Sequence, residues 1–335
     1  MLCAAGIQSP GPRGWVLDLL GTIKTKISAL SEGDYTPGLK AVLRHIETAF
    51  RHLERGQTSS DDAAFTDAIY RTNQAFEGSV KEAYRVLGGR DPSHERPYEI
   101  ERYLEGNNLL RTRVLKQLTN YRTEWRNPST HDYKLDFDES EAFLAIVSVC
   151  AFACLLIDLI AEHLSFVAAK TEAEANKIVL AAQLERSREA SLVERTIDAI
   201  REFCRSSSFL IGGAATSQTE LQIIGALHGF LSAVAPDLKV ESQVRLPGKG
   251  FEADLLVGKR DESVVIEVKR YNSKNAGNAV GQIWGYLLAS GLTRGVLLLA
   301  PSEPGELAVD EITLTGSDLE LTILRPAQTP SPVFF

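Results

Sequence analysis

Two carboxylates and a lysine interrupt apolar runs that otherwise have the composition of buried strands. Asp254 lies in FEADLLV, and Glu267 and Lys269 alternate in VVIEVK. Because side chains alternate between the faces of a strand, Glu267 and Lys269 share a face, and a hairpin through the turn GKRDE would bring Asp254 beside Glu267. Burying two carboxylates side by side costs several kcal/mol per ion unless positive charge compensates. The pattern therefore favours a site for a hard divalent cation, which carboxylates and substrate phosphate can hold together.

The same residues have a simpler interpretation, a solvated edge strand with a cross-strand ion pair, and the surrounding elements weigh against it. Glu220 extends the apolar stripe of a predicted helix, and Gln282 and Tyr286 lie four residues apart on one face of a second helix. Periodicity and turn residues predict the order helix, three strands, helix, strand, with a further edge strand in LELTILRP. The predicted helices cover 219–235 and 278–290, and the strands 238–246, 251–257, 263–268, 295–299 and 319–326.

Asp254 followed by the Glu267–Lys269 pair, in an αβββαβ order, resembles the PD-(D/E)XK nuclease superfamily of restriction-endonuclease-like folds. Glu220 matches the acidic residue that many members carry on their first helix. Gln282 and Tyr286 resemble the QxxxY motif of the RecB-like branch. The domain as a whole is similar to RecB- or Mrr-like nuclease domains. The resemblance covers residues 219–325, and the sequence departs from the name of the motif in lacking a proline before Asp254.

This resemblance implies a metal-dependent nuclease that hydrolyses phosphodiester bonds of DNA, and it favours an endonuclease over an exonuclease. Asp254, Glu267 and the carbonyl of Val268 would hold Mg²⁺ or Mn²⁺. Glu220 would reach the metal directly or through water. Lys269 would orient the attacking water and stabilise the charge that develops on the phosphate.

Other residues near the motif have two possible roles each. Gln282 and Tyr286 are expected to position the backbone, and Tyr286 is also a candidate contact for nucleic acid. His228 could replace Glu220 as a metal ligand, although a partly buried structural histidine is the favoured interpretation. A local basic rim could contact phosphates or be only a solvated surface. It consists of Arg245, Lys259, Arg270 and Lys274.

A second group of chemically capable residues, Arg126, Asn127 and His131, lies in the segment TEWRNPSTHDYKLDFD. Predicted helices over 59–88 and 98–121 precede it, and a helix that begins near Asp138 follows it, so it is expected to be a loop of an up-and-down bundle. Ordinary roles suit each residue: arginine at a helix C-terminus, Asn-Pro in a turn and histidine at the surface. On spacing alone these roles are favoured.

In front of the last helix of an all-α bundle, however, the three residues resemble the Rx4-6H motif of HEPN domains. These domains are helical ribonucleases or RNA-binding modules that usually pair as dimers, and the resemblance covers 36–170. It implies metal-independent RNA cleavage in which His131 transfers a proton, Arg126 stabilises phosphate charge and Asn127 positions the pair. A homodimer would use the apolar helix over 142–157, and Glu77 is expected to face the site.

The composition is that of a soluble globular protein with more than one domain. The chain has 335 residues and a formal net charge of −8, so no global basic surface predicts passive coating of nucleic acid. The N-terminus lacks the pattern of a signal peptide, and the uncharged segment 142–157 is shorter than the about 20 residues of a membrane span. The four cysteines lack zinc-binding spacing. We therefore expect a cytoplasmic protein without a membrane partner.

Together these patterns predict a multidomain α and α/β chain with two candidate nuclease sites. Such a pairing suggests a role in prokaryotic anti-phage defence. Two alternatives stay open: a DNase whose helical half serves only dimerisation or sensing, and a nucleic-acid-binding regulator without catalysis. The predicted parts are an N-terminal extension over 1–35, a HEPN-like all-α bundle over 36–170, a helical connector and linker over 171–218, a restriction-endonuclease-like domain over 219–326 and a tail over 327–335.

Overall fold

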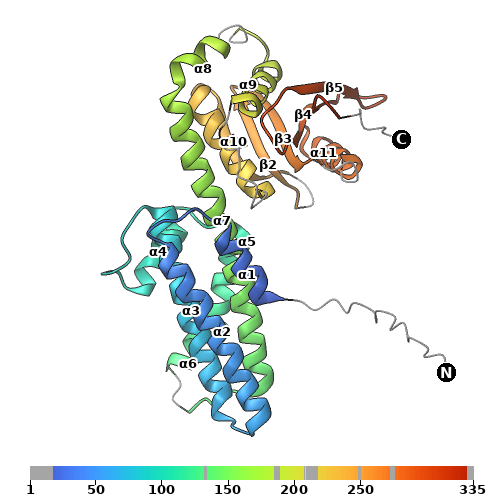
Figure 1. The fold of residues 1–335 in the computed structure, drawn as a ribbon. Helices are drawn as coiled ribbons and strands as arrows, with labels where there is room; N and C mark the ends of the chain where they lie inside the picture. Colours follow the sequence, from blue (N-terminus) through green and yellow to red (C-terminus); the bar gives the residue numbers. More distant parts are fainter. Residues whose placement is uncertain are drawn as a thin grey trace, which may run out of the picture. The chain divides into compact units, whose positions relative to one another are not determined.

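A computed structural model describes residues 18–131, 134–184, 189–206, 208, 218–247, 250–271 and 276–329 (Figure 1). The chain divides into two compact units, unit 1 (Met1–Glu82 and Asp91–Leu156) and unit 2 (Ala83–Arg90 and Ile157–Phe335). Two long helices, α3 (Ala63–Gly88) and α7 (Glu139–Ala175), contribute to both units. Unit 1 is helical and unit 2 contains a mixed six-stranded sheet, which confirms the predicted combination of α and α/β parts.

Unit 1 packs its helices around an aromatic core. Phe76 of α3 stacks on Tyr121 with 4.6 Å between ring centroids, and its centroid lies 5.0 Å from that of Phe152 in α7. The predicted start of α7 is confirmed, because the backbone N–H groups of Asp138 and Glu141 each donate to the other residue's carboxylate at 2.9 Å. The other described elements are α1 (Leu19–Ser28), α2 (Thr36–Ser59), α4 (Pro97–Gly106), α5 (Thr112–Tyr121), the π-helical turn η1 (Arg122–Arg126) and α6 (Asn127–His131).

Two helical predictions for unit 1 are wrong in detail. Residues 98–121 do not form one helix, because α4 ends at Gly106 and Asn108 takes a left-handed φ of 53° before α5 begins. Glycine and asparagine have low helix propensity and tolerate such a break, so they outweigh the apolar periodicity on either side. Residues 123–131, predicted as a loop, continue α5 through η1 and α6. There the hydroxyl of Ser129 bonds back to the carbonyl of Trp125 at 2.7 Å.

The helix α7 is long and apolar enough to cross a membrane by length and composition alone, and it is the single such helix in the described part of the chain. Its most apolar window has a mean hydropathy of 2.7, and half of that window is buried inside the protein. The core helix of a soluble protein meets the same criteria. These properties agree with the predicted soluble protein, and the cytoplasmic location stays a prediction.

Unit 2 is built on a sheet with the strand order β1-β2-β3-β4-β6-β5. β4 pairs in parallel with β3 and β6, and the other neighbours are antiparallel. The predicted αβββαβ order runs from α10 (Glu220–Val234) through the first three strands and α11 (Ala276–Ser290) to β4. The strands are β1 (Lys239–Arg245), β2 (Glu252–Lys259), β3 (Glu262–Arg270), β4 (Arg294–Ala300), β5 (Leu307–Thr313) and β6 (Glu320–Pro326).

The prediction of an edge strand over 319–326 is wrong. β6 lies between β4 and β5, with the run Leu321–Leu324 buried. The edge strand next to β6 is β5, which was not predicted from the sequence. Its residues from Ala308 alternate between half-buried and exposed positions, as expected for a strand with one face toward the protein and the other toward solvent.

Helices cover both faces of the sheet. On one face, α10 packs with α8 (Lys177–Leu184) and α9 (Leu192–Ser206) against residues of β3 that include Ile266 and Val268. On the other face, α11 packs against Val265 and Leu297. The predicted continuous helix over 171–205 is therefore wrong: α7 ends at Ala175, and α8 and α9 are separate helices whose apolar residues join the core of unit 2.

α10 lies close to α7 where two glycines face that helix. A Cβ atom on Gly225 would stand 2.2 Å from the carbonyl oxygen of Glu162, and one on Gly229 would stand 2.2 Å from that of Phe166. Any side chain at either position would push the two backbones apart. Glycine is therefore required here by the close approach of two helices, both within unit 2.

Candidate active site

The hairpin of β2 and β3 brings the predicted carboxylates together. Continuing its antiparallel register by one pair places Asp254 opposite Glu267. The backbone N–H of Val268 donates a 2.8 Å hydrogen bond to Asp254 Oδ2. Lys269 Nζ lies 2.7 Å from Glu267 Oε1 and 3.9 Å from Asp254 Oδ2. The three side chains singled out from the sequence therefore share one site.

A third carboxylate comes from the start of α10. Thr219 caps this helix in a reciprocal arrangement with Gln222, which makes Glu220 its first residue. Glu220 Oε2 lies 3.7 Å from Lys269 Nζ, and Glu220 Oε1 accepts a 3.3 Å hydrogen bond from the backbone N–H of Arg270. One ammonium group thus lies among carboxylates from three different elements.

Burial sets the charge balance of this site. Glu267 is only 1% exposed, and burial, reinforced by the neighbouring Asp254, raises its pKa to about 7. Burial also raises the pKa of Asp254, although the nearby Lys269 opposes this shift. Burial alone would lower the pKa of Lys269, but the surrounding carboxylates outweigh it and raise that pKa, so the lysine is protonated at neutral pH. The site therefore holds more potential negative charge than its one lysine balances.

The donor set fits a hard divalent cation. Glu267 Oε2 is buried and has no hydrogen-bond partner among the described residues, as expected for an oxygen that a bound cation would satisfy. The same part of the chain contains no group of three His, Cys, Asp or Glu side chains arranged for a metal. A cation would therefore depend on Asp254, Glu267 and the main-chain carbonyl of Val268, which lies 3.3 Å from Lys269 Nζ.

The raised pKa of Glu267 predicts a loss of stability of the metal-free protein as the pH rises from about 4.5 to about 7. The folded state favours the protonated carboxyl. Its contribution to the free energy of unfolding is therefore complete below the pKa of the unfolded chain and is lost as the pH rises through the pKa of the folded protein. The shift corresponds to on the order of 3 kcal/mol. Denaturant unfolding in EDTA across this range measures it. Glu267→Gln should lose this pH-dependent component, whereas Glu262→Gln, at an exposed position of the same strand, should keep it. Identical profiles for wild type and Glu267→Gln would contradict the assignment.

Gln282 and Tyr286 of α11 contact the backbone at the start of β2. Tyr286 Oη donates a 3.0 Å hydrogen bond to the carbonyl of Glu252, and Gln282 Nε2 bonds to the same hydroxyl. The Tyr286 ring meets Phe251 edge-on at 5.5 Å between centroids. Tyr286 is buried, at 2% exposure, and its hydroxyl is hydrogen-bonded to the backbone. The side chain is therefore not exposed for the contact with nucleic acid that the sequence predicted. These contacts fix the strand two residues before Asp254.

One residue of the site was missed by the sequence analysis. Gln243 of β1 donates a 3.2 Å hydrogen bond from Nε2 to Asp254 Oδ1. It stands between the pairs Ser242–Leu255 and Val244–Ala253 and has a left-handed φ of 51° inside a strand. Such a conformation costs a non-glycine residue about 1–3 kcal/mol and is often found at functional sites. A single glutamine in an alternating strand carries no spacing signal that could have revealed it.

Replacing Gln243 by glycine is expected to weaken Mg²⁺ binding by about tenfold, because Asp254, the predicted metal ligand, loses the donor that orients it. Glycine adopts a positive φ without cost, so the fold should keep its stability. Calorimetric titration with Mg²⁺ and thermal unfolding measure the two effects separately. Ser242→Ala, one residue earlier on the same strand, serves as the control. Unchanged affinity in Gln243→Gly would refute this positioning role.

The structure shows the surroundings of two residues of the expected basic rim and of His228, the alternative metal ligand. Arg270 has an exposed side chain beside the site, and Lys274 lies outside the described residues. Lys259 Nζ lies 3.0 Å from Asp237 Oδ2. His228 packs on Phe166, with 4.7 Å between ring centroids, and burial lowers its pKa. These contacts agree with a structural histidine.

The geometry described above is that of this chain alone, without a related structure beside it. Comparisons with protein-family models, with curated proteins and with solved structures find no match. The chemistry is therefore inferred from the carboxylates, the lysine and their hydrogen-bond partners, together with the motifs found in the sequence.

The second predicted group lies in η1 and α6 of unit 1. Arg126 Nη1 donates to Asn127 Oδ1 at 3.1 Å, and Arg126 Nε lies 3.4 Å from Glu77 Oε1. The expected approach of Glu77 is therefore present in the structure. His131 is the last residue of α6, and its side chain lies outside the described residues.

A buried polar network anchors this turn to α3. Asn73 Nδ2 donates to Ser129 Oγ at 2.7 Å, and Tyr121 Oη donates to Thr72 Oγ1 at the same distance. Buried networks whose members are all paired hold a segment in one geometry. The π-helical turn that carries Arg126 is itself a feature that recurs at functional sites.

Proposed function

We propose that this protein is a metal-dependent nuclease that hydrolyses DNA phosphodiester bonds at the β2–β3 site. The observation that carries the proposal is Glu267, which is buried beside Asp254 and the protonated Lys269 and has one oxygen without a hydrogen-bond partner among the described residues. A purely structural role does not account for it, because well-packed apolar residues would be at least as stable as this charged cluster. The αβββαβ order with parallel β3 and β4 supports a restriction-endonuclease-like fold.

Each residue has a distinct role in this proposal. Asp254, Glu267 and the Val268 carbonyl hold Mg²⁺ or Mn²⁺, and Glu220 supports them directly or through water. When bound, the ion supplies an activated water and stabilises negative charge on the phosphate. The ammonium of Lys269 donates to the phosphate oxygens and holds the attacking water in line.

The remaining residues support binding and orientation. Gln282 and Tyr286 hold the start of β2, and Gln243 orients the Asp254 carboxylate. The exposed guanidinium of Arg270 is available to phosphates, and Lys274 is proposed for the same role. An endonuclease is favoured over an exonuclease.

The direct test is cleavage of supercoiled plasmid with Mg²⁺, with Mn²⁺ and with EDTA. Wild type should cut in the presence of either metal and should be inactive in EDTA. Asp254→Asn, which keeps the size of the side chain and removes its charge, should be inactive throughout. Cleavage by Asp254→Asn at the wild-type rate would refute the proposal.

A second function is favoured by the contacts of Arg126 with Asn127 and Glu77 in the turn before α7. We propose that unit 1 is a HEPN-like domain that cleaves RNA without a metal. His131 transfers the proton, Arg126 stabilises charge on the phosphate and Asn127 positions the guanidinium.

The apolar residues of α7 supply a surface for the homodimer that such domains form. Phe143 and Leu144 are each 52% exposed, and such a pair is typical of a surface that another protein covers. The expected partners are therefore DNA, RNA and a second copy of the chain. A cytoplasmic nuclease with two such sites suits prokaryotic anti-phage defence, and phage plating on cells with and without the active protein tests this.

A further inference from the structure

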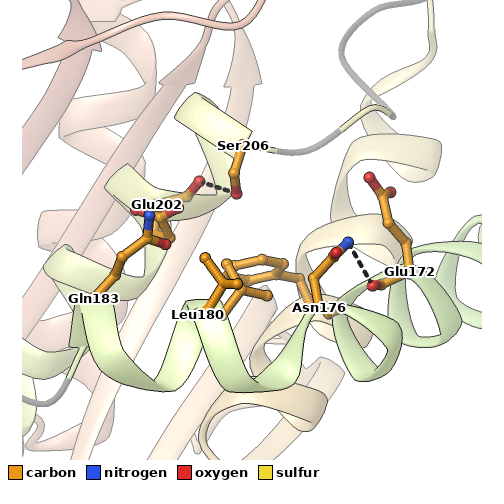
Figure 2. Close-up of a pocket in the computed structure, with 9 residues that line it drawn as sticks. Glu172, Asn176, Leu180, Gln183, Glu202 and Ser206 are labelled. Carbon is orange, nitrogen blue, oxygen red and sulfur yellow. Dashed lines mark hydrogen bonds between the residues drawn. The ribbon is translucent and has the colours of Figure 1, made fainter.

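A pocket of about 250 Å³ lies among α7, α8, α9 and α10 of unit 2 (Figure 2). None of its lining residues belongs to the β2–β3 hairpin, so it is distinct from the proposed nuclease site. Its volume is close to the lower end of pockets that bind small organic molecules. The pocket therefore has room for a compact ligand.

The buried carboxylate of Glu202 forms part of the wall. Glu202 of α9 is 4% exposed, and its Oε2 pairs with the guanidinium of Arg205. Its Oε1 is buried and has no hydrogen-bond partner among the described residues. A buried acceptor without a donor is costly, and a ligand N–H in the pocket would supply that donor.

The rest of the lining combines an apolar surface with amide groups. Leu180 of α8 and Phe230 of α10 are nearly fully buried and form the apolar part. Gln183 and Asn176 supply side-chain amides, and Asn176 Nδ2 donates to the carbonyl of Glu172 at 3.1 Å. Figure 2 shows Leu180 and Gln183 on α8, Glu202 and Ser206 on α9, and Glu172 near the end of α7. Such a mixture holds a ligand through an apolar body and orients it through a few polar contacts.

Charge decides the class of ligand. Among the described residues, the lining contains two carboxylates, Glu172 and Glu202, and neither lysine nor arginine. Arg205 lies outside the lining but pairs with Glu202 and offsets one of these two charges. Glu172 Oε1 accepts a 3.0 Å hydrogen bond from the backbone N–H of Ser208. A phosphate or carboxylate ligand would be repelled, whereas a cation would be attracted.

We propose that this pocket binds a small organic cation, whose ammonium or amidinium group donates to Glu202 and whose apolar body packs on Leu180 and Phe230. The proposal is independent of the nuclease function, since the two sites share no residue.

The test uses the full chain and four probes of similar size. Benzamidine and phenethylamine represent the amidinium and ammonium arms, benzamide is the neutral match and benzoate the anionic one. Calorimetric titration should show saturable binding of at least one cation and none of benzamide or benzoate. Glu202→Gln should weaken that binding by about tenfold or more, as expected for a lost charge-assisted hydrogen bond.

Glu194→Gln provides the matched control, because Glu194 is an exposed residue at the other end of α9. It should bind the cation as wild type does. Leu180→Phe, which fills the pocket without altering its charge, should also abolish binding. The inference is overturned if neither cation binds at millimolar concentration, if benzamide binds as well as benzamidine, or if folded Glu202→Gln retains wild-type affinity. The comparison of probes on wild type holds even if a variant does not fold.

Discussion

Replacing Lys269 by alanine is expected to reduce Mg²⁺-dependent DNA cleavage by roughly 10²–10³-fold, the usual effect of removing one donor that stabilises a developing oxyanion. The ammonium lies within hydrogen-bond distance of Glu267 and of the Val268 carbonyl, so it stands where metal and phosphate would meet. Plasmid nicking at saturating Mg²⁺ gives the rate. Lys259→Ala is the matched control, because that lysine extends from β2 and pairs with Asp237.

Metal affinity separates loss of catalysis from loss of the site. Removing the ammonium leaves Asp254, Glu267 and Glu220 without their shared positive neighbour, so Lys269→Ala should bind Mg²⁺ at least as tightly as wild type. Calorimetric titration measures this affinity. A variant that binds metal but does not cut identifies Lys269 as a catalytic residue. A variant that cuts normally removes the basis of the nuclease proposal.

The second large effect is expected at the other site. Wild-type protein should cleave RNA in excess EDTA, and His131→Ala should reduce this activity by roughly 10²–10⁴-fold, the usual contribution of a proton-transferring group. Arg126→Lys should also lose most activity, because lysine keeps the charge but lacks the planar pair of donors. Gel analysis of labelled RNA gives both rates. His94→Ala removes an exposed histidine of the same unit and should leave cleavage unchanged.

The two assays together separate the competing functions. RNA cleavage in EDTA that survives in His131→Ala would contradict the second site. Metal-dependent DNA cleavage without any RNA cleavage would favour a DNase whose helical unit serves only dimerisation or sensing. Nucleic-acid binding without either activity would favour a non-catalytic regulator.

Sequence patterns predicted the elements that have strong boundaries. Gly88 ends α3, and Gly291, with a φ of 74°, follows α11 as predicted. The position of Asp254 opposite Glu267 on the paired strands was also predictable, because strand alternation and a short turn leave little freedom of register. Sequence patterns could not show that β6 lies inside the sheet, since pairing partners depend on contacts between distant parts of the chain.

The missed residue of the site has a similar cause. The role of Gln243 arises from a left-handed backbone in a strand whose sequence shows ordinary alternation. The hydrogen bond that it gives to Asp254 spans two strands and cannot be derived from spacing. The break between α4 and α5 was likewise missed because a long apolar periodicity continues on both sides of it.

The close approach at Gly225 and Gly229 limits how this chain can be dissected. A fragment that begins at residue 219 would keep the whole αβββαβ order but lose Glu162 and Phe166, against which these glycines lie. It would expose bare helical backbone and apolar surface to water, and we expect it to aggregate. A fragment that keeps these two contacts has to begin near Ile157, inside a helix whose first half belongs to unit 1. The αβββαβ domain that carries the proposed site is therefore not portable on its own: recombination between genes could not transfer it intact without also carrying half of α7.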